Sequence, residues 1–307
     1  AAGLDARIHA VAAGEGSKSV AGITQLWDWM LGGGVERSDV VVALGGGVVG
    51  DLAGFAAATT LRGIGLVQVP TTLLATVDSS VGGKTGINHP AGKNLIGAFY
   101  QPPLVVIDPD LLRTMPPREF NSGWAEIVKH AIIQRSTPGG ERGDLDTFLV
   151  RNAERLLRAD EPALSYMIRR NVALKAAVVQ ADERETGIRA YLNFGHTLGH
   201  AIEASDYTLL HGEAIALGMR AAARIGEEAG TCDRATVEAI DKLIDRFGLP
   251  KTHRIDPERT LPLMTSDKKR AAGKQRWVLP VTGGGVTMRD DIGPDLIVRA
   301  LDSVTIS

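Results

Sequence analysis

Short apolar runs alternate with a helical stretch in the first third of the chain. Residues 39–44, 66–70 and 104–108 are brief and rich in β-branched side chains, which predicts strands. The first of these runs ends in glycines and predicts a buried parallel strand. Residues 52–58 predict a helix. Strands that alternate with helices favour an α/β layer around a parallel sheet.

Beyond about residue 115 the apolar positions recur at helical spacing instead. Pro116 and Pro117 lie at this change and favour a domain boundary, with an α/β domain over residues 1–115 and a mostly helical domain over 116–307. A small hairpin is expected late in the chain, over residues 276–287. The predicted helices of the second domain cover residues 124–134, 145–157, 163–180, 197–204, 213–229 and 234–247.

The composition is that of a globular protein and argues against several classes of protein, but it does not identify a function. The chain has 307 residues, of which 44% are hydrophobic and 23% charged, with a net charge of −2. Nothing here favours a nucleic-acid or membrane surface, and no apolar run reaches the roughly 18 residues of a membrane span. Cys232 is the only cysteine, which excludes an intrachain disulfide and fits a reducing compartment, so a cytoplasmic protein is expected.

A glycine-rich turn follows the first predicted strand. Gly45-x-Gly47-x-x-Gly50 opens a helix, as a dinucleotide-binding turn does, because free N–H groups there attract a pyrophosphate. A tight turn without a ligand is the competing interpretation. No acidic residue ends a second strand about 20 residues later, so a nicotinamide cofactor would be held in a non-standard way.

A second glycine-rich segment, expected to be a loop, runs from Asp78 to Asn94. Lys84 and Lys93 lie in it, and ammonium groups beside backbone N–H donors suit a phosphate or a carboxylate. A phosphate-binding NTPase loop is rejected, because its first glycine would fall on Asp78. The competing interpretation is a solvated surface loop.

Three of the seven histidines fall within sixteen positions, at 196, 200 and 211. His196 and His200 are four residues apart and share a helix face. Two histidines and one carboxylate make an open metal site, which could hold zinc or iron, and satisfied core histidines are the alternative. Glu126 and Lys129 also share a face, although taken alone they read as a surface ion pair. Further polar candidates near this cluster are Lys175, Glu185, Arg189, Asn193 and Lys268.

Taken together, these segments resemble the 3-dehydroquinate synthase family of the sugar-phosphate cyclase superfamily. The resemblance spans residues 45–280 in the family's order and spacing. The segment SVGGKTGIN around Lys84 resembles the dehydroquinate form and not the sister cyclases. The matching stretches are GGGVVGDLAGFAAATTLRG, VPTTLLATVDSSVGGKTGINHPAGKNLIGAFYQP, AEIVKHAII, LKAAVVQADERETGIRAYLNFGHTLGHAIEA, LLHGEAIALGM and SDKKRAAGKQRWVLP.

The resemblance implies a Rossmann-like, NAD-binding N-terminal domain, a helical metal-binding domain and a homodimer. It implies that Zn²⁺ or Co²⁺ is held by Glu126, His196 and His211. NAD contacts are implied for Glu15, Lys18, Gly46, Gly47, Asp51, Thr71, Thr72, Lys84 and Lys93. Contacts with a sugar-phosphate substrate are implied for Asp78, Lys84, Lys93, Asn94, Lys129, Lys175, Glu185, Arg189, Asn193, His200 and Lys268, with Arg62 reaching the neighbouring subunit's site.

The family carries a further strand–helix portion before the Gly14-Glu15 segment, so the NAD domain is expected to be N-terminally truncated here. The activity implied is conversion of 3-deoxy-D-arabino-heptulosonate 7-phosphate to 3-dehydroquinate. The alternatives are another sugar-phosphate cyclase, a glycerol-dehydrogenase-like metal-dependent alcohol dehydrogenase, and a binding protein without catalysis.

Overall fold

The computed structural model describes residues 3, 5–140, 143–206, 208–268 and 275–306. The chain divides into two compact units, Ala1–Leu112 and Arg113–Ser307. This division falls three residues before the boundary that the prolines predict. Among the described residues, no helix is both long enough and apolar enough to cross a membrane.

A three-stranded parallel sheet forms the centre of the first unit, as predicted. Its order is β1 (Val40–Gly45), β2 (Gly65–Pro70) and β5 (Leu104–Val105), with Val67 of β2 opposite both Val42 and Leu104. Helix α2 (Gly47–Thr59) follows β1 and covers one face, where its side chains join a core with α1 (Val20–Gly32). The third strand is shorter than predicted.

The prediction that β1 is a buried strand is wrong for one of its faces. Val40, Val42 and Leu44 are 54%, 58% and 60% exposed, whereas Ala43 on the opposite face is 2% exposed. The reason is that α2 and α1 contribute their apolar side chains to the Ala43 face alone among the described residues. The strand is therefore parallel, as expected, but apolar on a face that nothing described here covers.

The segment predicted to be a glycine-rich loop is largely a β-hairpin, which corrects that prediction. Strands β3 (Lys84–His89) and β4 (Gly92–Phe99) pair antiparallel, with Gly86 opposite Gly97. A Cβ on Gly97 would lie 2.1 Å from the Thr85 carbonyl oxygen, so glycine permits the close approach of the strands. A short π-helical turn (Ala75–Ser79) precedes the hairpin.

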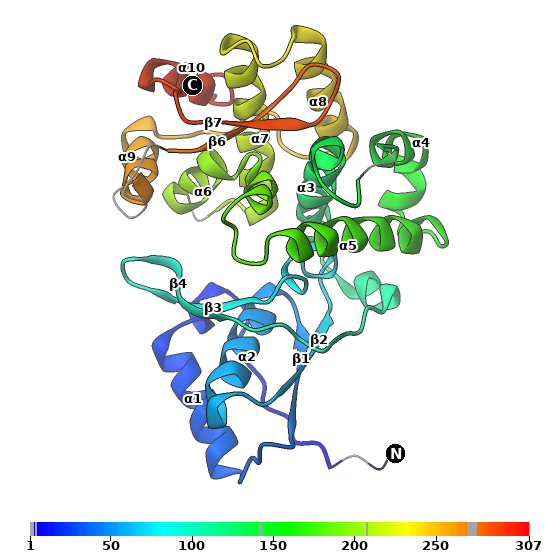
Figure 1. Ribbon diagram of the computed structural model, residues 1–307, viewed down its shortest axis with the longest axis vertical. Coiled ribbons are helices and arrows are strands. Elements are labelled where there is room, and N and C mark those ends of the chain that lie inside the picture. The colour runs from blue at the N-terminus through cyan, green and yellow to red at the C-terminus, as the bar shows by residue number, and fades with distance from the viewer. Residues whose placement is uncertain (1–2, 4, 141–142, 207, 269–274, 307) are drawn as a thin grey trace. The chain divides into compact units, whose positions relative to one another are not determined.

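Helix α7 (His211–Glu228) is the centre of the second unit, and it is buried over most of its length. Figure 1 shows α6 (His196–Ser205) beside it, and the two pack closely. The predicted late hairpin is confirmed as β6 (Trp277–Pro280) and β7 (Val286–Arg289). The remaining helices are α3 (Pro117–Ile133), α4 (Leu145–Leu157), α5 (Ala163–Ala181), α8 (Arg234–Arg246), α9 (Pro257–Lys268) and α10 (Pro294–Asp302).

Glycines set the distance between α6 and α7. A Cβ on Gly218 of α7 would lie 2.0 Å from the carbonyl oxygen of Gly195 and 2.7 Å from the amide nitrogen of Gly199. A Cβ on Gly212 would lie 1.9 Å from the carbonyl oxygen of Ser122 in α3. These contacts leave no room for side chains, so the start of α6 is held close to the middle of α7, and the start of α7 is held close to α3.

Candidate metal centre and polar sites

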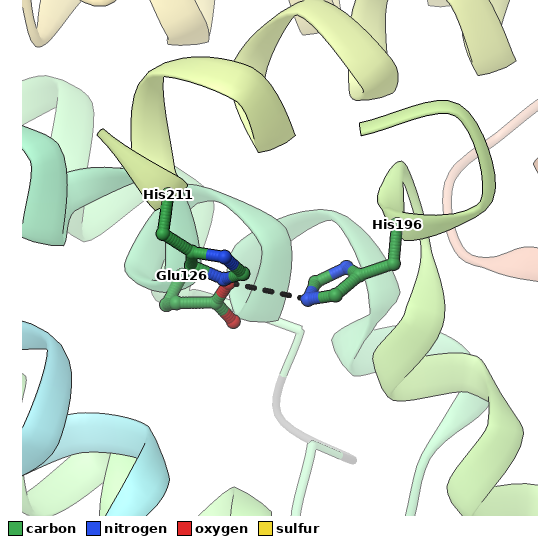
Figure 2. Close-up of side chains that lie close together, drawn as sticks. All are labelled: Glu126, His196 and His211. Atoms are coloured by element: carbon green, nitrogen blue, oxygen red, sulfur yellow. Dashed lines mark ion pairs between the residues drawn. The ribbon is translucent and has the colours of Figure 1, made fainter. Parts of the chain in front are cut away.

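Three side chains from three helices converge in the second unit. Glu126 comes from α3, His196 begins α6 and His211 begins α7 (Figure 2). Nε2 of His196 lies 3.4 Å from Oε1 of Glu126, and Nε2 of His211 lies 3.5 Å from the same oxygen. Glu126 is fully buried, so the structure brings the three predicted ligands together around one buried carboxylate.

Each histidine is anchored through its other ring nitrogen. Nδ1 of His196 lies 3.1 Å from the carbonyl oxygen of Phe194, and Nδ1 of His211 lies 3.1 Å from Oε2 of Glu203. Both acceptors lack hydrogens, so each Nδ1 carries the proton and donates it. Nε2 is therefore the nitrogen of each ring that is left to bind a metal, and in both rings it is the one that faces Glu126.

The buried carboxylate is kept charged by its neighbours. Burial by itself favours the protonated form, but Lys129 and the histidines outweigh it and hold the pKa of Glu126 well below its usual range. Burial likewise opposes charge on His211, yet the neighbouring carboxylates of Glu126 and Glu203 raise the pKa of His211 to about 10. The carboxylates of Glu126 and Glu203 therefore stabilise positive charge at the His211 ring. They would stabilise a divalent cation there for the same reason that they stabilise the protonated ring.

The residues fit a tetrahedral divalent metal. Oε1 of Glu126 is buried and accepts no hydrogen bond from the described residues, although burial of an unsatisfied carboxylate oxygen is costly. With metal–ligand bonds of about 2.1 Å, tetrahedral ligand atoms lie roughly 3.4 Å apart, which is the spacing of Oε1 from each Nε2. A cation bonded to all three atoms would satisfy the orphaned oxygen.

Several other predicted polar residues of this unit lie on α3, on α5 and in the segment between α5 and α6. Lys129 pairs with Oε2 of Glu126, so this pair is a buried one and not the surface ion pair that spacing alone suggests. Lys175 is buried on α5, and Arg189 is buried in a 3₁₀ turn (Ile188–Asn193). Asn193 donates its side-chain amide to Glu185 at 2.5 Å.

Asp182, for which no role was predicted, stabilises the loop before the 3₁₀ turn of residues 188–193 through hydrogen bonds. Its carboxylate accepts backbone N–H groups of Thr186, Gly187 and Arg189 at 2.9, 2.7 and 3.0 Å. These hydrogen bonds lower the pKa of Asp182 to about 2. The loop holds Glu185 at a φ of 59°, so Asp182 stabilises a conformation that costs energy locally.

His200 lies apart from the three ligands but next to them. Its ring centroid is 5.0 Å from that of His196 and 5.8 Å from that of His211. The residue is exposed, while crowding around the ring and repulsion from the other two histidines lower its pKa. At neutral pH His200 is therefore a neutral, accessible imidazole beside the ligand cluster.

In the first unit, four of the predicted NAD residues, Gly46, Gly47, Thr71 and Thr72, lie at the carboxyl ends of β1 and β2. A Cβ on Gly46 would lie 2.9 Å from the Thr72 side chain, and the amide of Thr71 donates to the Gly45 carbonyl at 2.9 Å. Gly47 opens α2, whose first N–H groups point toward the same turn. Parallel sheets bind ligands at this edge, so the geometry suits the predicted pyrophosphate site.

A buried lysine joins two further groups of predicted residues. Nζ of Lys18 donates to Asp51 at 2.7 Å and to Asn94 at 2.6 Å, and Lys18 is 3% exposed. Asn88, which carried no predicted role, accepts the amide of Asn94 at 2.9 Å and donates to Glu15 at 2.8 Å. Asn88 thus links the segment predicted to contact NAD with the one predicted to contact substrate.

The remaining predicted residues of this unit are more dispersed. Asp78 lies in the π-helical turn, a rare feature that is frequent at functional sites. Lys84 begins β3 and Lys93 lies on β4, both exposed, and Arg62 is exposed after α2. In the second unit Lys268 ends α9, and its side chain lies outside the described residues.

Backbone strain marks several of these positions. Five described non-glycine residues have a positive φ, and three of them are predicted to contact substrate: Arg62 at 70°, Asn94 at 56° and Glu185 at 59°. Such conformations persist where the surroundings impose them, often at functional sites. The strain is an indication of function that is independent of the sequence motifs.

Sequence comparison decides the family. The N-terminal model of 3-dehydroquinate synthases matches residues 8–122 and the C-terminal model matches residues 123–270. The 3-dehydroquinate synthase of Picosynechococcus sp. is 46% identical over 98% of this chain and 82% of that protein. The chain belongs to the 3-dehydroquinate synthase family. It is an enzyme family, as the histidine cluster predicted.

Solved structures place this 3-dehydroquinate synthase family member among the sugar-phosphate cyclases. A 2-epi-5-epi-valiolone synthase from Streptomyces hygroscopicus, with NAD⁺ and Zn²⁺ bound, matches at a TM-score of 0.87 and 29% identity, over 95% of this chain and 81% of that one. A 2-deoxy-scyllo-inosose synthase with NAD⁺, Co²⁺ and carbaglucose-6-phosphate matches at 0.80 and 28%, over 94% and 80%. The predicted fold class is confirmed.

The alternative enzymes are not favoured. A probable glycerol dehydrogenase from Sinorhizobium meliloti matches at a TM-score of 0.59 and 20% identity over 76% of this chain and 67% of that one, which shows a shared fold alone. The sister cyclases are less similar in sequence than the 3-dehydroquinate synthase at 46%.

Proposed function

We propose that this chain converts 3-deoxy-D-arabino-heptulosonate 7-phosphate to 3-dehydroquinate and phosphate, as a carbon–oxygen lyase. The observation that carries the proposal is the convergence of Glu126, His196 and His211 around one orphaned buried oxygen, in a chain matched along both halves by this family. NAD and Zn²⁺ or Co²⁺ are the cofactors, as in the structural relatives.

The metal would be held by those three side chains, and its charge would acidify a substrate hydroxyl. Lys129 keeps the Glu126 carboxylate ionised, which is the form that binds a metal. It is also assigned to contact the substrate. Lys175, Glu185, Arg189, Asn193 and Lys268 are assigned to substrate binding in the second unit. The two lysines and the arginine favour an anionic substrate.

When bound, NAD would supply a transient oxidation at C5 of the substrate, which would permit β-elimination of phosphate across C6–C7 and would be reversed before the product forms. The turn at Gly46 and Gly47 and the threonines after β2 would bind its pyrophosphate, with Glu15, Lys18 and Asp51 on adjoining elements. Lys84, Lys93, Asn94 and Asp78 present cationic and polar groups toward the phosphate and hydroxyls of the substrate.

His200 is assigned to proton handling or phosphate contact. It is accessible, and its lowered pKa keeps the ring neutral at physiological pH, so one ring nitrogen can accept a hydrogen bond from the substrate. A homodimer is also proposed, with Arg62 acting in the partner's site. The left-handed backbone at Arg62 supports a functional role for this exposed side chain.

The test is phosphate release from the heptulosonate phosphate, measured with and without NAD and with and without a chelator. We expect release that needs both cofactors while NADH does not accumulate. Stoichiometric NADH with a simple polyol and no phosphate release would favour the alcohol-dehydrogenase alternative. NAD titration of the same chain tests the non-catalytic alternative.

A further inference from the structure

Glu203 is a carboxylate next to the metal centre that neither the motifs nor the comparisons assign. It lies on α6, seven residues after His196 and three after His200. Its Oε2 accepts a hydrogen bond from Nδ1 of His211 at 3.1 Å. Its side chain is 14% exposed, so this contact is shielded from water.

The hydrogen bond decides which nitrogen of His211 can bind a metal. A carboxylate accepts, so Nδ1 keeps its proton and Nε2 is the nitrogen that can lose its proton to a metal. Nε2 is the nitrogen that lies 3.5 Å from Oε1 of Glu126. For His196 the Phe194 carbonyl has the same effect, but a carboxylate is charged and makes the imidazole a stronger ligand.

We propose that Glu203 is a positioning residue for the metal, which holds His211 in the ligating tautomer and orientation. The inference rests on the proposed function, since it requires that Glu126, His196 and His211 bind a metal. Removal of a carboxylate that accepts a hydrogen bond from a metal-binding histidine typically lowers the metal affinity about ten- to a hundredfold.

A competing geometry is a second cation site. Nitrogen atoms of His200 and His211 and an oxygen of Glu203 lie within 4.8 Å of one another. The hydrogen bond argues against it, because Nδ1 of His211 cannot both donate to Glu203 and bind a cation. His200 is exposed, whereas Glu126 supplies a fully buried carboxylate to the first set.

The test is the Zn²⁺ affinity and stoichiometry of the full chain by competition with a chromophoric chelator, for the wild type, Glu203→Gln and Glu203→Leu. Gln has nearly the shape of Glu but supplies a weaker, neutral acceptor. We expect one ion per chain, with affinity reduced about tenfold in Glu203→Gln and up to about a hundredfold in Glu203→Leu. Glu228→Gln, the same change at the far end of α7 where Glu228 pairs with Arg299, should keep wild-type affinity.

Thermal unfolding in excess EDTA separates positioning from folding. We expect Glu203→Gln to unfold like the wild type in EDTA but to gain less stability from Zn²⁺. Wild-type affinity in both Glu203 variants would overturn the inference, as would two ions per chain with one lost in the variants. If the wild type itself binds no Zn²⁺, the proposed metal site fails, a result distinct from unchanged binding in the variants.

Discussion

The histidines of this chain are distinguished by what holds their second nitrogen. His196 is anchored by a backbone carbonyl and His211 by a carboxylate, while His200 lies beside them with an exposed ring. Spacing in the sequence predicts the three histidines together and, with the family resemblance, predicts two of them as ligands. It does not reveal Glu203, because the contact to His211 joins two helices and has no local signature.

His196→Ala should lose both the metal and turnover, since it removes one of three ligands. We expect zinc occupancy near zero by elemental analysis after dialysis, with affinity reduced by about a hundredfold or more. His253→Ala is the matched control, because His253 bonds Asp206 at 2.7 Å and lies outside the ligand set. Full zinc occupancy in His196→Ala would refute the ligand assignment.

Asn88→Ala should weaken NAD binding and substrate binding together. The side chain holds Glu15 and the amide of Asn94, whose φ of 56° needs such support. We expect both the NAD dissociation constant and the substrate KM to rise about three- to tenfold, from the loss of about 1 kcal/mol of hydrogen bonding. Among the described residues, the Asn152 amide donates to the Phe148 carbonyl within α4, so Asn152→Ala should leave both constants unchanged. An effect on neither constant would exclude the linking role.

Asp182 should make the loop over residues 182–189 sensitive to acid. Its pKa is about 2 in the folded chain against an ordinary value of 3.8, so it stabilises the fold fully above about pH 4 and loses that contribution as the pH falls toward 2. We expect the protection of the Thr186, Gly187 and Arg189 amides against exchange, relative to the intrinsic exchange rate at each pH, to fall across this window. In Asp182→Asn the fall in protection should be much smaller, and an identical pH profile would count against the assignment.

At the scale of elements, the spacing of α6 and α7 depends on glycine. Gly218→Ala would push a methyl group to 2.0 Å from the carbonyl of Gly195, which directly precedes His196. We expect a loss of about 3 kcal/mol in unfolding free energy and a lower metal affinity, since the α6 terminus must move. Chemical denaturation and zinc titration measure the two effects.

Gly32→Ala provides the control for that substitution. Gly32 ends α1, and nothing lies within 4 Å of the position a Cβ would take. Its replacement should be neutral or slightly stabilising. Equal stability of Gly218→Ala and wild type would show that the α6–α7 contact is more compliant than the structure indicates.

Several elements were predictable from periodicity, and others were not. Apolar spacing predicts the helices α3 to α8 of the second unit, whereas α9 and α10 were not predicted. Helix α1 carries the same signal in Ile23, Leu26 and Met30 and was not predicted either. The β3–β4 hairpin was not predictable, because its glycines lower strand propensity locally while enabling the close pairing of Gly86 and Gly97. In α9 the internal Pro262 opposes a helical prediction.

At the scale of the whole molecule, all three proposed metal ligands lie in the second unit, together with its own core. We expect residues 113–307, expressed alone, to fold and to bind one Zn²⁺ with an affinity within about threefold of the full chain. Circular dichroism and chelator competition test this, with the His196→Ala fragment as the control. A folded fragment that binds no zinc would place a necessary group in the first unit.

The exposed face of the parallel sheet has a consequence for handling the protein. Val40, Val42, Leu44 and Leu104 present branched apolar side chains to solvent, each more than half exposed. Exposed apolar side chains of this kind favour association with other apolar surfaces, and more strongly so in salting-out conditions. Hydrophobic dyes should therefore fluoresce with the native chain, and a dye-based melting curve would start from a high baseline, so intrinsic fluorescence of the four tryptophans is the better reporter of its unfolding.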